Sequence, residues 1–247
     1  MQRARRLASV AVVAAVAVTG LSACRSQPDV AAYLAAGDIS VARVQQVYND
    51  ARNKQSAPAA TPSPGETAAP AALPLTQANV LDTLVSHQVL MTLAQRHNVQ
   101  IPSPLPIDDI AGLLHLSKNA EYVKLYGEVV LLQSALNKAG QGGSLADADI
   151  AEIYQRLKAL KAVDPTSTLA SFTAGLPAEA KKQLGIAVAL RNEVRDEVAK
   201  EHFRLNPRYP AFEIPVLTNI DQQGAVLVLV AQPVGDRNAS VPVTDVG

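Results

Sequence analysis

Apolar residues recur at helical spacing through most of the chain between residues 41 and 204. Apolar positions three, four and seven residues apart fall on one face of an α-helix, so runs of them predict amphipathic helices. Shorter apolar runs bounded by turn residues, which are typical of strands, lie near both ends. We therefore expect a mainly α fold with a small β-sheet formed by N- and C-terminal segments. The predicted helices are 41–53, 76–98, 107–116, 119–139, 144–163 and 177–204, and the predicted strands are 30–34, 212–218 and 224–230.

Polar residues and prolines at the expected helix starts support these boundaries. Ser40 is expected to cap the first helix, because a serine hydroxyl accepts a backbone N–H at a helix start. Ser144, with Asp147 three residues later, resembles a capping box. Pro177 suits the first turn of the last helix, because its missing N–H has no partner at that position.

The second half of the last predicted helix is dense in charged residues. A charge run on a long helix is usually a solvated face that is supported by pairs four residues apart. We interpret this run in the same way. Its members are Arg191, Glu193, Arg195, Asp196, Glu197, Lys200, Glu201 and Arg204.

The helix expected at 76–98 is apolar nearly all round in its middle. Such a helix is central in a core, or it faces a partner as well as a core. If it faces a partner, its apolar excess lines a groove for extended polypeptide segments, and the flexible Met91 side chain suits such a groove. The candidate groove residues are Leu84, Leu90, Met91 and Leu93. The alternative is that the same four residues belong to the core.

Five prolines interrupt the chain between residues 55 and 75. Because proline lacks a backbone N–H, this stretch is predicted to be a semi-extended insert without a helix or an internal strand. The chain then divides into a leader and one domain over 24–247. The parts are 1–23, an N-terminal strand and first helix at 24–54, the proline-rich insert at 55–75, a helical body at 76–206 and an extended C-terminal segment at 207–247.

The first 24 residues have the proportions of a lipoprotein signal peptide. Three arginines within the first six residues precede an Ala- and Val-rich stretch of about 13 residues, which is too short to span a bilayer comfortably. Leu21-Ser22-Ala23-Cys24 then resembles the bacterial lipobox, in which signal peptidase cleaves before a lipid-modified cysteine. The resemblance implies that Cys24 is the lipid-attachment residue and that acyl chains anchor the mature, extracytoplasmic protein to the bacterial cell membrane. The alternatives are an ordinary secretory signal with a chance cysteine and an uncleaved anchor helix.

Charge and composition exclude several kinds of function. The 247 residues carry 22 basic and 22 acidic side chains, and residues 1–23 hold three of the basic ones and no acid. Cleavage would therefore leave 19 basic and 22 acidic residues, a net charge of −3. This balance does not predict a nucleic-acid binder, which needs a basic face. A single cysteine excludes an internal disulfide and a cysteine-based zinc site.

No catalytic or metal-binding motif is visible in the sequence. The chain lacks GxSxG, P-loop and GxGxxG patterns. Its four histidines do not have the spacing of a metal site, and they are His87, His97, His115 and His202. We predict that the protein is not an enzyme and binds no metal, no small-molecule substrate and no cofactor beyond the covalent diacylglycerol and acyl chain on Cys24.

The order of the elements resembles the N-terminal chaperone module of SurA-type and PrsA-type extracytoplasmic foldases. The residues that suggest it are Val30-Ala31-Ala32-Tyr33, then Gly37-Asp38-Ile39-Ser40, and at the other end Asn206-Pro207-Arg208-Tyr209. Pro210 stands where members of the family usually have glycine. The insert at 55–75 and the apolar tail at 224–232 do not match the pattern of the family. The resemblance implies a multi-helix, chaperone-like module. The 37 residues between Ala139 and Pro177 are too few for the parvulin domain of the isomerases, so it implies polypeptide binding without isomerase activity.

Two kinds of function stay open at this point. The first is a membrane-anchored chaperone-like lipoprotein whose partners are unfolded or exported proteins. The alternative is a structural or scaffold lipoprotein of the cell envelope that binds one folded partner. A solute-binding lipoprotein is disfavoured, because such proteins usually have two α/β lobes and this chain has few predicted strands.

Overall fold

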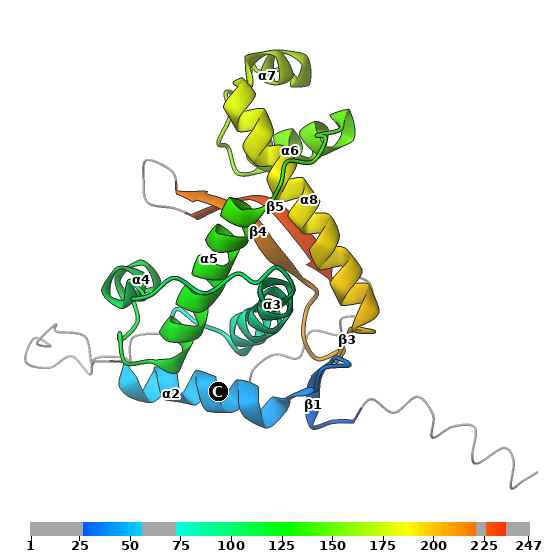
Figure 1. Cartoon of the computed structure of the whole chain (residues 1–247). Coiled ribbons are helices and arrows are strands. Elements are labelled where there is room, and N and C mark those ends of the chain that lie inside the picture. Colours follow the sequence, from blue (N-terminus) through cyan, green and yellow to red (C-terminus); the bar gives the residue numbers. More distant parts are fainter. Residues whose placement is uncertain (1–26, 56–72, 221–225, 236–247) are drawn as a thin grey trace, which may run out of the picture.

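The computed structural model describes residues 27–55, 73–220 and 226–235, which form a mainly helical fold with two small antiparallel sheets (Figure 1). This confirms the fold class that the hydrophobic pattern predicts. The helices are α2 (Val41–Lys54), α3 (Gln77–Arg96), α4 (Ile107–Leu114), α5 (Glu121–Ala139), α6 (Asp147–Ala159), α7 (Leu169–Gly175) and α8 (Ala178–Lys200). The strands are β1 (Val30–Tyr33), β2 (Ile39–Ser40), β3 (Arg204–Leu205), β4 (Phe212–Ile220) and β5 (Val226–Val234).

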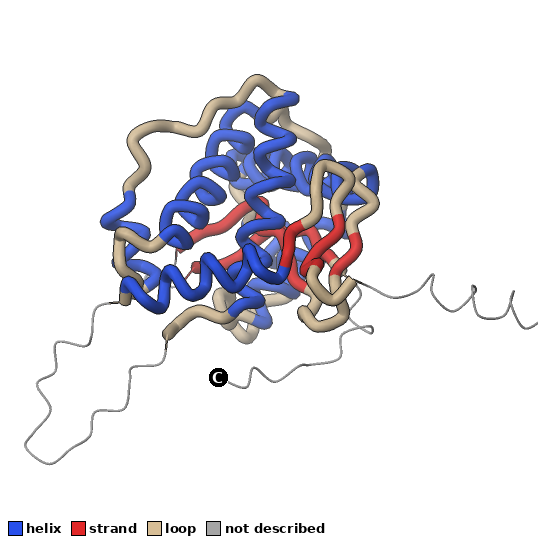
Figure 2. The backbone as a smooth tube through the Cα atoms, turned by 90° about the horizontal axis from the view of Figure 1, so that it is seen from below, coloured by secondary structure: helices blue, strands red, loops and turns tan. Residues whose placement is uncertain are grey.

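Helix α2 and the pair α6–α7 mark opposite ends of the described molecule (Figure 1). Helix α2 packs against α3 and α5, and α8 packs against α3, α5 and the hairpin of β4 and β5. The three short strands form a small sheet beside the helices, whereas the β4–β5 hairpin runs among them (Figure 2). Helix α7 was not expected from the sequence.

Helix α3 is the centre of the core. It contacts α2, α5, α8, β1 and β4. Burying a leucine or valine side chain contributes roughly 1.5–3 kcal/mol, so a helix buried on several sides is the main source of apolar stabilisation here. Thr76 caps this helix by accepting the Asn79 backbone N–H at 3.1 Å. Its side chains with at most 1% exposure are Val80, Leu81, Val85, Val89, Leu90 and Leu93.

The N-terminal strand β1 is the middle strand of the three-stranded sheet, in the order β2-β1-β3. Ala32 lies opposite Leu205, and Tyr33 lies opposite Arg204, whose guanidinium is 5.0 Å from the Tyr33 ring centroid. The first and last parts of the domain therefore pair, but not through the hairpin strands that the sequence offered. The partner of β1 is β3, whose first residue, Arg204, the helix prediction had included in the last helix.

That prediction was wrong because α8 ends at Lys200 rather than near Arg204. His202 has a left-handed backbone with φ +49°, which a helix does not contain. The Phe203 N–H then bonds back to the Val198 carbonyl at 3.3 Å, which closes the helix end. The turn at His202 sends the chain back antiparallel to β1.

Ser40 caps α2 as predicted, with its hydroxyl accepting the Arg43 N–H at 3.1 Å. The capping box predicted at Ser144 and Asp147 is wrong. Helix α6 begins at Asp147, and the Asp149 carboxylate accepts the Ala146 N–H at 3.1 Å. Asp149, rather than Asp147, bonds the free N–H at the helix start, so the helix begins later than the pattern indicated. Pro177 precedes the first turn of α8 rather than lying in it.

The charged run of α8 is only in part the solvated face that the sequence predicts: Arg195, Asp196 and Lys200 are exposed, but three other members pair with neighbouring helices. Arg191 reaches across to α6, with nitrogens 2.8 Å from Asp149 and 2.9 Å from Glu152. Glu193 lies 2.5 Å from His97 at the end of α3, and Glu197 pairs with Arg96 of the same helix. These charges therefore join α8 to two other helices.

The terminal hairpin pairs β4 with β5 from Phe212–Val234 to Ile220–Val226, with an irregular register between Pro215 and Thr218. Proline has no N–H to give to a ladder, which favours a bulge at this point. Two side-chain amides of α5 donate hydrogen bonds to backbone carbonyls of β4 at this irregularity. The Gln133 side chain donates to the Pro215 carbonyl at 2.7 Å, and the Asn137 side chain donates to the Val216 carbonyl at 2.7 Å.

Several sequence predictions lie outside the described residues. They are the leader 1–23 with its lipobox, the attachment residue Cys24, and the larger part of the proline-rich insert. The division of the chain into these parts stays a prediction.

Candidate functional site

The structure divides the four groove residues that the sequence suggested. Leu90 and Leu93 are completely buried in the core, so their assignment to an open groove was wrong. Leu84 and Met91 are half-buried and pack against the same core. The reason is that α3 has neighbours on several sides, which cover the apolar surface that its sequence offered to a partner. These four residues do not form a binding surface in this structure.

The two ends that suggested the chaperone module meet at Asn206. This side chain is buried, and its amide donates to the Val30 carbonyl at 2.7 Å. Its backbone N–H donates to the Ala31 carbonyl at 3.0 Å, and its side-chain oxygen accepts the Arg208 N–H at 3.1 Å. Asn206 therefore holds the N-terminal strand to the segment that follows α8. Burying an amide with its hydrogen bonds satisfied is the condition under which such a residue stabilises a fold.

An apolar strand that is partly open to solvent lies at the first half of β5. Val226 is 36% exposed, and Leu227, Val228 and Leu229 are half-buried. In the described part of the chain β5 pairs only with β4. The second half of β5 is more buried, with Val230 and Ala231 in the core. A strand with an unpaired edge can accept another extended segment through main-chain hydrogen bonds.

A cavity of about 180 Å³ lies between α3, α5 and this hairpin. One part of its lining is apolar, formed by Val129, Val130, Pro215, Val226 and Val228. The other part is polar, formed by Asn79, Asp82, Thr83, Ser86, Tyr122, Tyr126, Gln133, Glu213 and Thr218. Mixed linings of this kind, with a few convergent polar groups, are typical of ligand sites.

Asp82 is the distinctive residue of this cavity. Burial raises the pKa of its carboxyl to about 7, and only the N–H of its own backbone opposes that shift. No basic side chain among the described residues pairs with it. A half-buried carboxyl without a cationic partner is unusual in a structural position, because burying an ionised group without a partner is costly.

Three kinds of hydroxyl group, from threonine, serine and tyrosine, line the cavity beside Asp82. Thr83 donates to the Tyr122 hydroxyl oxygen at 3.2 Å, deep in the structure. Burial raises the pKa of Tyr122 to about 12 and also raises the pKa of Tyr126, so both rings carry neutral hydroxyls at physiological pH. Ser86 is 2% exposed and lines the same cavity.

Glu213, the second acid of the cavity lining, has a cation of its own. The Arg156 guanidinium of α6 makes two contacts with its carboxylate, at 2.5 and 3.1 Å. The same contacts raise the pKa of Arg156. The Glu213 charge is therefore compensated, and the negative charge that an ionised Asp82 brings to the cavity is not.

Asp82 was not among the residues predicted from the sequence, although a signal for it was present. It is the only acidic residue between Thr76 and Asn98, the stretch that the pattern showed to be apolar nearly all round. A helix that is apolar on nearly all sides has no solvated face on which a lone carboxylate could lie. Such a carboxylate is therefore expected to be paired or functional. The other cavity residues come from four elements and have no common sequence pattern.

Two of the four histidines pair with glutamates of other helices. His87 lies 2.8 Å from Glu128, and His97 pairs with Glu193. In residues 27–55, 73–220 and 226–235, no three His, Cys, Asp or Glu side chains gather closely enough to hold a metal ion. None of the described helices combines the length and apolar character that a membrane span requires.

Comparisons with protein-family models, curated proteins and solved structures give no match for this chain.

Proposed function

We propose that this protein is a lipid-anchored, extracytoplasmic, chaperone-like protein that binds unfolded or exported polypeptides and has no isomerase activity. The sequence of residues 1–24 supports the anchor and the compartment. The meeting of β1 with the Asn206 segment supports the likeness to a chaperone module, because the two stretches that suggested it lie side by side.

The main support for polypeptide binding is the open first half of β5. Its Val-Leu-Val-Leu run is partly exposed, and it has high strand propensity. The opposite strand of the hairpin has two of its carbonyls bonded by α5, and β5 pairs with β4 alone among the described strands, so we expect strand addition at the other edge of β5. Main-chain pairing at such an edge does not depend on the sequence of the incoming segment, which suits a binder of many unfolded chains.

Placing a lysine at Leu227 is expected to weaken this binding. Leu227 is half-buried and lies outside the core cluster, and lysine on an edge strand opposes strand addition. The wild-type protein without its leader should suppress the aggregation of denatured, reduced lysozyme, measured by light scattering. The Leu227→Lys variant should lose at least about half of that effect.

The matched control is Leu160→Lys, which places the same charge on an exposed leucine at the end of α6. It should retain the wild-type effect. Equal loss in both variants would assign the suppression to general apolar surface, and an absence of suppression by the wild-type protein would refute the proposal. Recovery of one folded partner in stoichiometric amount, with no unfolded clients, would favour a scaffold lipoprotein instead.

Removing the cysteine is expected to release the protein from the membrane. In the Cys24→Ala variant no thioether can form, so the acyl chains that give stable anchoring are absent. Fractionation of bacteria that express the full chain should move the protein out of the detergent-extracted membrane fraction, and incorporation of labelled palmitate should disappear. Ser26→Ala, two residues beyond the cysteine, should behave as wild type. Retention and labelling of the Cys24→Ala variant would contradict the lipid anchor.

A further inference from the structure

We propose that the cavity between α3, α5 and the hairpin binds an alkylammonium group, with the ammonium paired to Asp82 and the alkyl chain against the apolar lining. This goes beyond the polypeptide-binding function and does not depend on it. The inference follows from the charge, the hydrogen-bonding groups and the size of the cavity.

The charge of the cavity fits a cation. Asp82 on α3 has no basic partner among the described residues, whereas Glu213 on β4 is paired with Arg156. The other titratable groups facing Asp82 are Tyr122 and Tyr126 of α5, which are neutral at physiological pH. A bound ammonium would supply the positive charge that the cavity lining does not offer to Asp82. It would thereby remove the cost of an unpaired buried carboxylate.

The hydrogen-bonding groups also fit an ammonium rather than an anion. An alkylammonium has three N–H donors and no acceptor, so it needs oxygen atoms around it. The cavity offers the Asp82 carboxylate, the Ser86 hydroxyl and the Tyr122 hydroxyl. Ser86 is nearly completely buried and lines the cavity, and a hydroxyl oxygen can accept an N–H from a ligand there.

The size of the cavity restricts the ligand to a small group. Its volume of about 180 Å³ lies below the roughly 300–1,000 Å³ of sites for drug-sized molecules. Four of the five apolar lining residues are valines, which can contact the methylenes of a short alkyl chain. A lysine side chain of a polypeptide and a free primary amine share this chemistry, and the experiment below separates them.

Binding should strengthen as the pH rises. Because burial raises the pKa of Asp82 to about 7, most of the empty sites are protonated at pH 5.5 and most are ionised at pH 8. Only the ionised form attracts the cation, and an alkylammonium itself stays protonated over this range, since its pKa lies near that of lysine, about 10.4. The ionised fraction rises about 30-fold between these two pH values, and the association constant should rise by a similar factor.

The test uses the protein without its leader and isothermal titration calorimetry with three probes at pH 8 and pH 5.5. The probes are n-butylammonium chloride, its neutral analogue n-butanol, and the capped peptide acetyl-Val-Lys-Val-amide. We expect butylammonium to bind at pH 8, butanol to bind at least tenfold more weakly, and the pH 5.5 affinity to fall by about 30-fold. Asp82→Asn should weaken butylammonium binding at least tenfold, whereas Asp196→Asn, a matched change on the exposed face of α8, should leave it unchanged.

Equal binding of butanol and butylammonium, no effect of Asp82→Asn, or no binding of either cationic probe at millimolar concentration would each overturn the proposal. Binding of the peptide that is tighter than that of butylammonium would identify lysine side chains as the source of the ammonium. Equal or tighter binding of butylammonium would identify free amines. Amine binding by a protein that fails to suppress aggregation would refute the proposed chaperone function and leave this site standing.

Discussion

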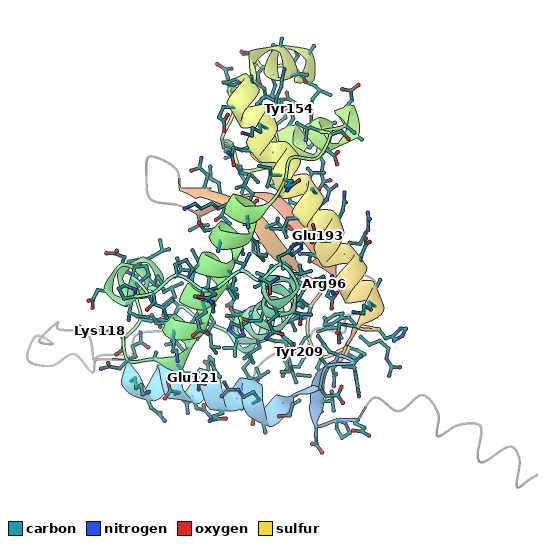
Figure 3. The ribbon with its side chains drawn as sticks, in the orientation of Figure 1. Arg96, Lys118, Glu121, Tyr154, Glu193 and Tyr209 are labelled. Atoms are coloured by element: carbon teal, nitrogen blue, oxygen red, sulfur yellow. The ribbon has the colours of Figure 1, made fainter. Side chains whose placement is uncertain are left out.

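Replacing Arg96 with methionine is expected to lower the free energy of unfolding by about 3 kcal/mol. Arg96, at the end of α3, pairs with Glu197 of α8, and Figure 3 shows it close to Glu193 of the same helix. The Glu197 side chain is 1% exposed, whereas Arg96 is 45% exposed. Methionine keeps the aliphatic stem and removes the charge, so the buried carboxylate loses its cation and the main cost is electrostatic.

One oxygen of Glu197 is already without a hydrogen-bond partner among the described residues, so this carboxylate has no second donor to replace the guanidinium. The measurement is chemical denaturation followed by circular dichroism at pH 7.5. Arg195→Met is the matched control, because Arg195 pairs with Asp196 on the exposed face and such pairs contribute about 0–1 kcal/mol. Adding Glu197→Gln to Arg96→Met should recover part of the loss, since a neutral buried amide costs less than a carboxylate. Equal small effects of the two arginine variants would show that the α3–α8 pair does not stabilise the fold.

Replacing Asp82 with asparagine is expected to stabilise the protein at neutral and alkaline pH. Burial raises the pKa of Asp82 from 3.8 to about 7, so the folded state binds this proton more tightly than the unfolded state does. Between about pH 4 and pH 7 the unfolded chain has lost the proton and the folded protein keeps it, so stability falls as the pH rises. The destabilisation of the folded protein by the Asp82 carboxyl is therefore complete above pH 7 and absent below pH 4. At about 1.36 kcal/mol for each pKa unit, the rise from 3.8 to about 7 corresponds to about 4 kcal/mol.

The measurement is the free energy of unfolding of both proteins at several pH values from 4 to 8. The Asp82→Asn variant should exceed the wild type above pH 7 and approach it near pH 4. Asp196→Asn, on the exposed face of α8, should follow the wild-type profile within about 0.5 kcal/mol. Parallel profiles of the wild type and Asp82→Asn would show that Asp82 is not held in a protonated form, and they would remove the pH dependence expected for amine binding.

Local sequence signals located most of the helices. Ser40 marks the start of α2, and the all-round apolar pattern at 76–98 identified the helix at the centre of the core. These signals are reliable because caps and periodicity depend on residues within one or two turns. Ends that depend on a single backbone turn were less well predicted. The last helix ends at Lys200 because of the left-handed residue His202, and histidine is not a residue that marks such a turn in a sequence.

The candidate cavity could not be predicted from the sequence. Asp82 was visible as the only acid of its helix, but whether a carboxylate is paired depends on the elements that surround it. Leu90 and Leu93 show the same limit, because apolar residues on three sides of a helix are consistent with a groove or with a core. Which of the two applies is decided by the number of neighbours that pack against the helix.

The sequence by itself therefore determined the class of fold, the central helix, and, through residues 1–24, the predicted lipid anchor. The tertiary structure decided which strand pairs with β1, which charges of α8 pair with α3 and α6, and which polar groups meet around Asp82. The physical reason is distance along the chain. Caps and helical faces join residues a few positions apart, whereas Arg96 and Glu197 are 101 residues apart and Val30 and Asn206 are 176 residues apart. Contacts over such separations are set by the packing of whole elements, which no local pattern records.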